Sequence, residues 1–275
     1  FVNQISIIIK NSRIYHELKM AKDSLEEKDK IIKDDLKMAA RIQKNFIPIK
    51  IPRVNGLNIH FAYIPMLELG GDFFDFLENR KEDEGQLGIL LTDASGHGVA
   101  AAFITSMVKM AFDSEKIRKV ANDPDRVLKE INNTILDKMA GNFITAVYCY
   151  LDIKKAKLKI SNGGHPPVLL VRDNNIHEIQ SKGSILGLFE EISFEVLEMD
   201  IIKNDRFFFY TDGLVDAIDQ AGEHFENKLF ELLLKFKNLS PSELNHELIK
   251  ELQKFVNTKE HFEDDIAIIC VDVKE

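Results

Sequence analysis

The sequence predicts an α+β protein in which two antiparallel sheets pack together, pairs of helices lie outside them, and a long helix precedes them. Three observations support this class. Residues 1–46 contain no Gly or Pro and read as one helix. From residue 57 onward, apolar residues alternate in short runs separated by turn residues, as in β-strands. Helical segments then come in pairs between runs of strands, not singly as in a doubly wound sheet.

Length, composition and charge limit the class of protein. The chain has 275 residues, of which 45% are hydrophobic, so a sizeable core is available. The net charge of −9 argues against a nucleic-acid-binding surface, which needs clustered positive charge. Residues 1–50 carry a net charge of +4 and the remainder −13, which indicates two different regions.

The N-terminal helix carries an apolar seam with alternating spacings of four and three residues. This spacing is typical of a coiled coil, and it predicts a parallel homodimer through residues 14–46. The alternative is a single amphipathic helix packed on its own domain. Pro48 and Pro52 end the helix. The seam, with polar interruptions at Lys28 and Asp35, consists of Ile14, Leu18, Ala21, Leu25, Lys28, Ile32, Asp35, Ala39, Ile42 and Phe46.

The rest of the chain divides into strands and helices. A charged segment at 79–85 predicts a hairpin turn, and Asn162 to Pro167 predicts a rigid loop. Helices are expected at about 98–115, 124–139, 225–237 and 241–257. Strands are expected at 57–64, 69–77, 86–92, 143–151, 157–161, 167–171, 176–179, 194–199, 206–211 and 266–271.

The two cysteines, Cys149 and Cys270, lie in apolar runs and are expected to be reduced core thiols. No apolar run approaches the 18 residues that a membrane span needs, and no signal peptide is recognisable. The chain begins at Phe1, so we expect a fragment of a longer protein, upstream of which a membrane segment could lie. The expected location is the cytoplasm.

Asp93 follows a buried strand and precedes a glycine-rich turn and an apolar helix. A lone carboxylate there is costly to bury. A bound cation removes that cost, and Gly96 and Gly98 let the backbone approach it. Alternatively, Asp93 caps the following helix.

Three further acidic turns flank strong strands, so four distant groups of carboxylates could converge at one edge of a sandwich. Left alone they would raise each other's pKa, whereas Mg²⁺ or Mn²⁺ would neutralise them. Two such ions can bind a phosphoryl group and activate a water molecule. Without convergence, these are ordinary turn aspartates. The four turns contain Asp72, Asp93, Asp212 and the pair Asp264 and Asp265.

Six ordered motifs resemble the SpoIIE/RsbU-like bacterial branch of the PPM (type 2C) metal-dependent protein serine/threonine phosphatases. The resemblance covers about residues 36–275 and implies an α-β-β-α sandwich with a two-metal site holding Mn²⁺ or Mg²⁺. The motifs are Leu69-Gly-Gly-Asp-Phe-Phe-Asp75, Asp93-Ala-Ser-Gly-His-Gly98, Phe143-Ile-Thr-Ala-Val-Tyr148, Asn162-Gly-Gly-His-Pro-Pro167, Phe209-Tyr-Thr-Asp-Gly-Leu-Val-Asp-Ala217 and Asp264-Asp-Ile-Ala267.

The resemblance also implies residue roles. Asp93 is expected to bridge both ions, and Asp72 and the backbone carbonyl of Ala94 to hold one of them. Asp212 and Asp264 are expected to hold the other. The attacking group is a metal-bound water held by Asp93 and Asp212, so no protein nucleophile is needed.

Other residues of these motifs are expected beside the metal ligands or in the loops that support them. Asp265 and Gly213 are expected beside the ligands. Ser95 is expected to be structural. His97 either orients the loop or acts as an acid toward the leaving oxygen, and a loop-bracing role is an equal alternative. His165 is expected to belong to a rigid scaffold loop.

The expected activity is removal of phosphate from Ser or Thr of an antagonist protein in a bacterial partner-switching pathway that controls a sigma factor. The alternatives are an inactive signalling scaffold and a phosphatase of small phosphoesters. Residues 1–18 resemble the last helix of a GAF-type sensor domain. We therefore expect residues 1–46 to link a sensor to a phosphatase domain at 47–275, and to regulate it by changes in helix packing.

Overall fold

The computed structural model describes residues 2–48, 50–78, 85–257 and 262–274, with the backbone alone for residues 2–9. The chain forms two compact units, Phe1–Ile42 and Gln43–Glu275. Helix α1 (Val2–Lys44) accounts for the first unit and confirms the predicted long helix. No helix in the described ranges combines the length and apolar character that crossing a bilayer requires.

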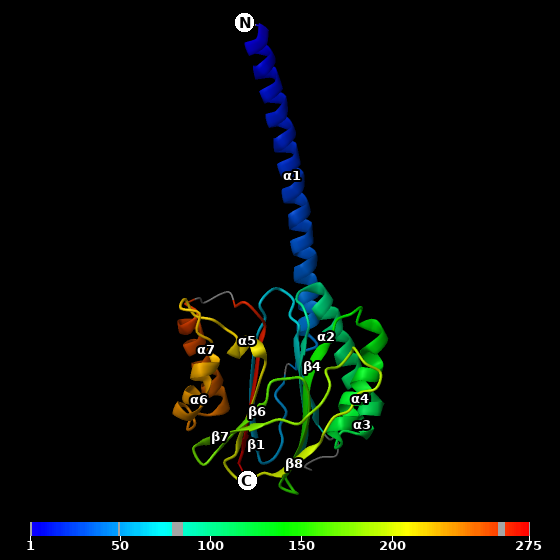
Figure 1. Ribbon diagram of the computed structural model, residues 1–275, viewed down its shortest axis with the longest axis vertical. Helices are drawn as coiled ribbons and strands as arrows, with labels where there is room; N and C mark the ends of the chain where they lie inside the picture. Colours follow the sequence, from blue (N-terminus) through cyan, green and yellow to red (C-terminus); the bar gives the residue numbers. More distant parts are fainter. Residues whose placement is uncertain (1, 49, 79–84, 258–261, 275) are drawn as a thin grey trace. The chain divides into compact units, whose positions relative to one another are not determined.

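The second unit contains two five-stranded antiparallel sheets, which confirms the predicted fold class (Figure 1). One sheet has the strand order β1-β10-β9-β6-β7, and the other has the order β2-β3-β4-β5-β8. The first comprises β1 (Leu57–Ile64), β10 (Ile266–Val273), β9 (Arg206–Tyr210), β6 (Val168–Arg172) and β7 (Asn175–Ile179). The second comprises β2 (Asp72–Glu78), β3 (Gln86–Ala94), β4 (Ile144–Asp152), β5 (Lys157–Gly163) and β8 (Leu197–Asp200).

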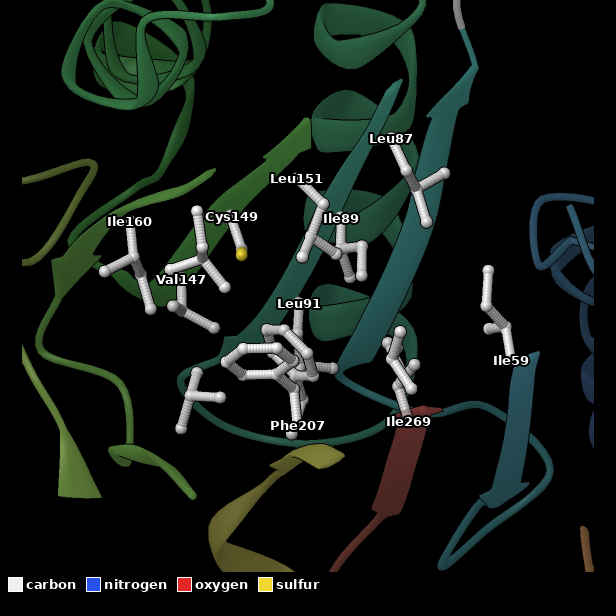
Figure 2. Close-up of a cluster of buried hydrophobic side chains, with 14 of the residues drawn as sticks. Ile59, Leu87, Ile89, Leu91, Val147, Cys149, Leu151, Ile160, Phe207 and Ile269 are labelled. Atoms are coloured by element: carbon white, nitrogen blue, oxygen red, sulfur yellow. The ribbon is translucent and has the colours of Figure 1, made fainter. Parts of the chain in front are cut away.

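The main core lies between the two sheets (Figure 2). Phe207 and Ile269 of the β1-containing sheet meet Ile89, Leu91 and other side chains of the β2-containing sheet there. Alternate residues of each strand enter this layer, as the two-residue period of a strand requires. Cys149 is part of this core, and Cys270 lies in the core on the outer face of its sheet; both are free thiols, as predicted.

Helices cover the outer faces of both sheets (Figure 1). On the β2-containing sheet lie α2 (Val99–Phe112), α3 (Glu115–Lys119), α4 (Pro124–Ile135) and the 3₁₀ turn η1 (Leu136–Lys138). On the β1-containing sheet lie α5 (Asp212–Val215), α6 (Glu226–Lys235) and α7 (Pro241–Phe255). The α-β-β-α layering is therefore present.

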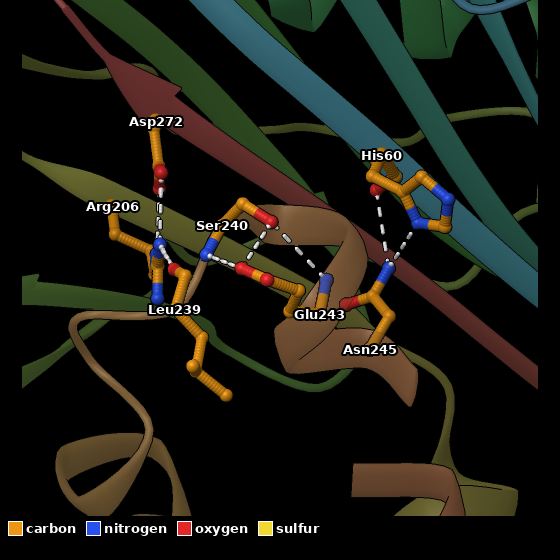
Figure 3. A network of polar contacts seen from close by, with 7 residues as sticks. All are labelled: His60, Arg206, Leu239, Ser240, Glu243, Asn245 and Asp272. Carbon is orange, nitrogen blue, oxygen red and sulfur yellow. Dashed lines mark hydrogen bonds and ion pairs between the residues drawn. The ribbon is translucent and has the colours of Figure 1, made fainter. Parts of the chain in front are cut away.

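Polar contacts fix α7 to its sheet (Figure 3). Ser240 and Glu243 form a capping box at the start of the helix. Arg206 of β9 forms an ion pair with Asp272 of β10, with Nε 2.6 Å from Oδ1, and also donates to the carbonyl of Leu239. This pairing stabilises the loop that leads into α7 at the end of the sandwich where β10 finishes.

Several predicted boundaries are wrong. The helix expected at 98–115 ends at Phe112 because Ser114 caps a separate helix by accepting a hydrogen bond from Ile117 N. The strand expected at 194–199 is the shorter β8. Asp212, which is expected in a turn, is instead the first residue of α5. Residues 79–84 of the expected hairpin turn lie outside the described residues.

Candidate active site

Polar side chains replace the apolar inter-sheet core at one end of the sandwich. On β2 and β3, Asp72 and Asp93 continue the inward-facing alternation of Phe74 and Leu91. The other strands do the same near this end: Tyr63 follows Phe61 on β1, Thr145 precedes Val147 on β4, Thr211 follows Phe209 after β9, and Asp265 precedes Ala267 before β10. The end of the inner layer is therefore a polar, largely acidic site.

Asp72 and Asp93 are direct cross-strand partners. In an antiparallel pair such residues project from the same face, with Cα atoms about 4.5–5.5 Å apart. The sequence places Asp93 at the end of its strand, and this is wrong: β3 continues through Ala94, which pairs with Ile144. The ladder extends because β3 has a partner strand on each side, so both Asp93 and Ala94 are held by regular backbone pairing.

Thr211 joins the two sheets at this site. Its hydroxyl donates to Asp72 Oδ2 at 2.6 Å and accepts from the backbone N–H of Ala267 at 2.8 Å. Asp212 follows directly and begins α5. Thr211 therefore fixes Asp212, which follows β9, relative to Asp72 on the opposite sheet.

Asp264 and Asp265 precede β10 and differ in their environments. Asp265 is 5% exposed, and its carboxylate accepts hydrogen bonds from the backbone N–H groups of Met66, at 2.7 Å, and Gly71. Asp264 is exposed, and its Oδ1 accepts from the N–H of Asp265 at 2.8 Å. Asp265 thus braces the loop before Asp72, whereas the Asp264 carboxylate is open to a ligand.

Two glycines allow close backbone contacts around the carboxylates. A Cβ on Gly71 would lie 3.0 Å from the carbonyl oxygen of Ala94, so this oxygen lies beside the backbone that leads into Asp72. A Cβ on Gly213 would lie 2.1 Å from the carbonyl oxygen of Asp265, so α5 packs directly on the start of β10. The backbone of Asp212 is thereby held close to Asp264 and Asp265.

The carboxyl groups repel one another. Burial, followed by the charges of Asp212, Asp264 and Asp265, raises the pKa of Asp93 to about 7. Burial is also the largest cause that raises the pKa of Asp72, with the charge of Asp93 next, and it raises the pKa of Asp212 ahead of the charge of Asp264. The charged groups that act most strongly on these carboxyls are other carboxyls, so no basic side chain among the described residues neutralises the cluster.

The donor set is that of a hard divalent cation: carboxylate oxygens and a backbone carbonyl, with excess negative charge. The hydroxyl of Tyr63 is buried beside Asp265 and Asp72 and has no hydrogen-bond partner among the described residues, which indicates that the site accommodates a further polar group. Among the described residues, however, no three His, Cys, Asp or Glu side chains already enclose the position of one ion. The residues fit such an ion in chemistry and charge.

The remaining expected residues have distinct positions. Ser95 is structural, since its Oγ accepts from Phe143 N at 2.9 Å and its own N–H donates to the Phe143 carbonyl. His97 is exposed on the loop before α2. His165 is buried at 2% exposure, with Nδ1 2.9 Å from Thr145 Oγ1.

Sequence reasoning missed Gln43. Its side-chain amide donates to the carbonyl of Gly70 at 2.6 Å and accepts from the Gly70 N–H at 3.1 Å. The same amide group donates to Thr105 of α2 at 3.1 Å. Gln43 lies near the end of the predicted N-terminal helix, but nothing in its spacing marks it as a partner of the loop before Asp72.

The sequence profile of the family described as "Stage II sporulation protein E (SpoIIE)" matches residues 83–274, which is more than half of the chain. The chain belongs to the SpoIIE family. Its two-sheet sandwich is the PP2C-type domain of that family.

The chain is similar in sequence to two curated relatives and in structure to one solved domain. The chain is 25% identical to phosphoserine phosphatase RsbU of Bacillus subtilis over 87% of this chain and 70% of RsbU. It is 30% identical to phosphoserine phosphatase RsbP of the same species over 88% of this chain and 58% of RsbP. The SiaA-PP2C domain of Pseudomonas aeruginosa has the same fold, with a TM-score of 0.78, 21% identity, and coverage of 89% of this chain and 98% of that domain.

Replacing Gln43 with Ala is expected to loosen the loop before Asp72. The change leaves the buried N–H and carbonyl of Gly70 without their partner, which costs about 1–3 kcal/mol. Thermal unfolding measures this loss, with Lys44→Ala, an exposed neighbour, as the control. Equal stability of the two variants would contradict the assignment.

The raised pKa of Asp93 predicts how metal-free stability depends on pH. An unfolded Asp titrates near pH 4, and the folded one near 7, so Asp93 contributes stability that is lost as pH rises between these values. Asp93→Asn is therefore expected to be more stable than the unmodified chain in a chelator. The difference should grow from about pH 4 to about pH 7 and stay constant above.

Comparing the two proteins cancels the effect of titrating groups that do not interact with Asp93, such as His165, whose pKa burial lowers to about 3. Chemical unfolding at several pH values in the presence of chelator measures the difference. A difference that does not grow with pH would show that Asp93 is not in an uncompensated acidic cluster.

Proposed function

We propose that this chain is a metal-dependent phosphatase of phosphoserine or phosphothreonine in a protein substrate. The observation that carries the proposal is the convergence of Asp72, Asp93, Asp212 and the Asp264–Asp265 pair at one end of the inner layer. These residues come from four separate segments and both sheets. A fold that gathers this much negative charge, with no compensating side chain in the part of the chain that the structure describes, is suited to binding cations.

The proposed ligands of two divalent cations, Mn²⁺ or Mg²⁺, are the carboxylates of Asp72, Asp93, Asp212 and Asp264 and the backbone carbonyl of Ala94. When bound, such ions coordinate phosphoryl oxygens and lower the pKa of water so that it attacks phosphorus directly. Asp93 occupies the centre of the cluster, since its pKa responds to Asp212, Asp264 and Asp265, and Asp93 in turn acts on Asp72.

The chain's own residues then hold the reactants in place. Asp93 and Asp212 orient the attacking water, because each is fixed by backbone contacts, Asp93 within β3 and Asp212 at the first residue of α5. Asp265 and Thr211 do not need to touch the substrate; their hydrogen bonds keep Asp72 and the loop before it in position. His97, which is exposed on the loop before α2, is the proposed proton donor to the leaving oxygen, with a loop-bracing role as the alternative.

The proposed substrate is a phosphorylated antagonist protein of a bacterial partner-switching pathway, which would act in the cytoplasm. The names of RsbU and RsbP as phosphoserine phosphatases support this class of substrate. The chain spans 58% of RsbP and 70% of RsbU. That it shares the activity of those whole proteins is therefore part of the proposal.

Phosphate release tests the activity. The chain is incubated with a phosphoserine protein of the antagonist class and, separately, with p-nitrophenyl phosphate, each with Mn²⁺ and with chelator. Mn²⁺-dependent release, faster on the protein, is the expected result. Release from p-nitrophenyl phosphate alone would favour a phosphatase of small phosphoesters. Binding of the protein without any release would favour a signalling scaffold.

We further propose that α1 transmits regulation through a dimer formed by residues 14–46. The apolar seam residues Ile14, Leu18, Ala21, Leu25, Ile32 and Ile42 are exposed in the single chain, with Leu18 and Leu25 each 67% exposed. Lys28 and Asp35 interrupt this seam, and Phe46 is half-buried against the core on the outer face of the β2-containing sheet. Such a seam favours a partner helix. The proposal predicts a dimer at micromolar concentration and altered activity after deletion of residues 1–35. A monomer whose activity is unchanged by that deletion would overturn it.

A further inference from the structure

His165 lies beside the acidic cluster in a row of side chains that crosses the β2-containing sheet. Asp72 on β2 pairs with Asp93 on β3, and Asp93 pairs with Thr145 on β4. Residues directly opposite in antiparallel strands project from the same face, so all three face the other sheet. The imidazole extends the row by one position, with Nδ1 2.9 Å from the hydroxyl of Thr145.

The opposite sheet approaches this row at both ends. At one end, Thr211 donates its hydroxyl hydrogen to Asp72. At the other end, the backbone carbonyl of Tyr210 acts on the His165 ring as an acceptor that favours a protonated nitrogen. Tyr210 and Thr211 are consecutive and immediately precede Asp212. The row that contains Asp93 is therefore linked to the segment before Asp212 at both ends, through Thr211 and Asp72 at one end and through Tyr210 and His165 at the other.

The loop that carries His165 is built to hold the ring in place. Asn162 accepts from the N–H of His165 at 2.8 Å and donates back to its carbonyl at 2.8 Å. Gly164 has a φ of +78°, and a Cβ there would lie 2.5 Å from Ile185 Cγ2, so the turn requires glycine. These contacts fix the orientation of the His165 ring, which a side chain that only filled space in an apolar layer would not need.

The ring is buried and neutral, and one of its nitrogens is unsatisfied. Nε2 has no partner with hydrogen-bond geometry among the described residues. A purely structural histidine at 2% exposure would be expected to have both nitrogens bonded, because an unpaired buried polar group is costly. The carbonyl of Tyr210, which acts on the ring, is the acceptor available to Nε2.

We propose that His165 is a positioning residue that sets the separation between Asp93 and Asp212, through Thr145 on one sheet and the Tyr210 carbonyl on the other. In its neutral form with the proton on Nε2, the ring accepts from Thr145 and donates toward Tyr210. With the site loaded, an Nε2–H···O=C contact to Tyr210 would hold the two sheets at the spacing that Asp93 and Asp212 need to share their ligands. The inference rests on the proposed function, because the spacing matters only if both carboxylates bind cations.

Four variants of the full chain test the proposal. His165→Ala removes both links. His165→Asn keeps an amide near the Nδ1 position, and His165→Gln places one near the Nε2 position. Thr145→Val removes the hydroxyl at nearly constant shape. The matched control is Tyr148→Phe, which deletes a buried hydrogen bond on the same strand, from Tyr148 to the carbonyl of Ala121, on the helix-covered side of the sheet.

Mn²⁺ affinity is measured by calorimetry, with thermal unfolding and steady-state kinetics on the same samples. His165→Ala and Thr145→Val are expected to weaken Mn²⁺ binding by about 10-fold or more, the usual effect of groups that orient metal ligands. Their kcat should fall with little change in KM. His165→Asn and His165→Gln should each recover part of the affinity, while Tyr148→Phe binds Mn²⁺ as the unmodified chain does.

Unchanged Mn²⁺ affinity and kcat in folded His165→Ala would overturn the positioning role and leave the proposed function standing. The same conclusion follows if His165→Ala loses no more affinity than Tyr148→Phe. If the unmodified chain neither binds Mn²⁺ nor releases phosphate, the proposed function fails, and this inference fails with it.

Discussion

Replacing Asp93 with Asn is expected to lower Mn²⁺-dependent phosphate release by roughly a thousandfold, since single groups that act on the transition state contribute about 10²–10³ each. Asp93, on β3, lies directly opposite Asp72, on β2. The charges of Asp212 and Asp264 also act on Asp93. Asn keeps the shape of the side chain but removes the charge that would hold both cations. The measurement is kcat at saturating Mn²⁺.

The control for this variant is Asp137→Asn, an exposed carboxylate in the 3₁₀ turn η1, which should keep full activity. Stability separates a site effect from misfolding, because metal-free Asp93→Asn should be at least as stable as the unmodified chain above pH 7. Full activity in Asp93→Asn would show that the reaction does not use this cluster.

Replacing Gly213 with Ala should disable the site by displacing a ligand. The new Cβ would lie 2.1 Å from the backbone oxygen of Asp265, and neither backbone can yield without moving α5 or the start of β10. Overpacking of this kind costs about 1–3 kcal/mol. A shift of about 1 Å in a reacting group lowers rates by about a hundredfold. We therefore expect a lower unfolding temperature and a loss of activity near that size.

Gly222→Ala is the comparison for Gly213→Ala. Gly222 has a φ of +85°, so Ala is strained there by about 1–2 kcal/mol, but a Cβ meets nothing within 4 Å. This variant should lose some stability and retain its activity. If Gly213→Ala retains activity as well, the contact between α5 and Asp265 does not position Asp212.

The sequence predicts the layers well because strand periodicity is a local property. Phe207 and Phe209, or Ile89 and Leu91, alternate with outward-facing residues, and that alternation alone assigns them to the inter-sheet core. The same alternation, continued by one step, places Asp72, Asp93 and Thr211 on the inner face, so the acidic end of the layer is encoded in the strands themselves.

Strand pairing and side-chain contacts join residues that are far apart in the sequence, so local sequence patterns predict them poorly. Asp93 belongs to the strand and not to the turn, because β4 supplies partners as far as Ile144. Asp212 begins a helix because Thr211 is tied to Ala267 and Asp72, neither of which is near it in sequence. Gln43 is polar and buried because it bonds the backbone of Gly70, 27 residues away.

If these carboxylates form one site for two divalent cations, the number of Mn²⁺ ions bound per chain reports it. Equilibrium dialysis of the full chain against Mn²⁺, with Asp93→Asn beside it, gives this number. We expect two ions per chain for the unmodified protein and fewer for Asp93→Asn. A folded, unmodified chain that binds no Mn²⁺ at millimolar concentration, or an Asp93→Asn variant that binds the same number, would contradict it.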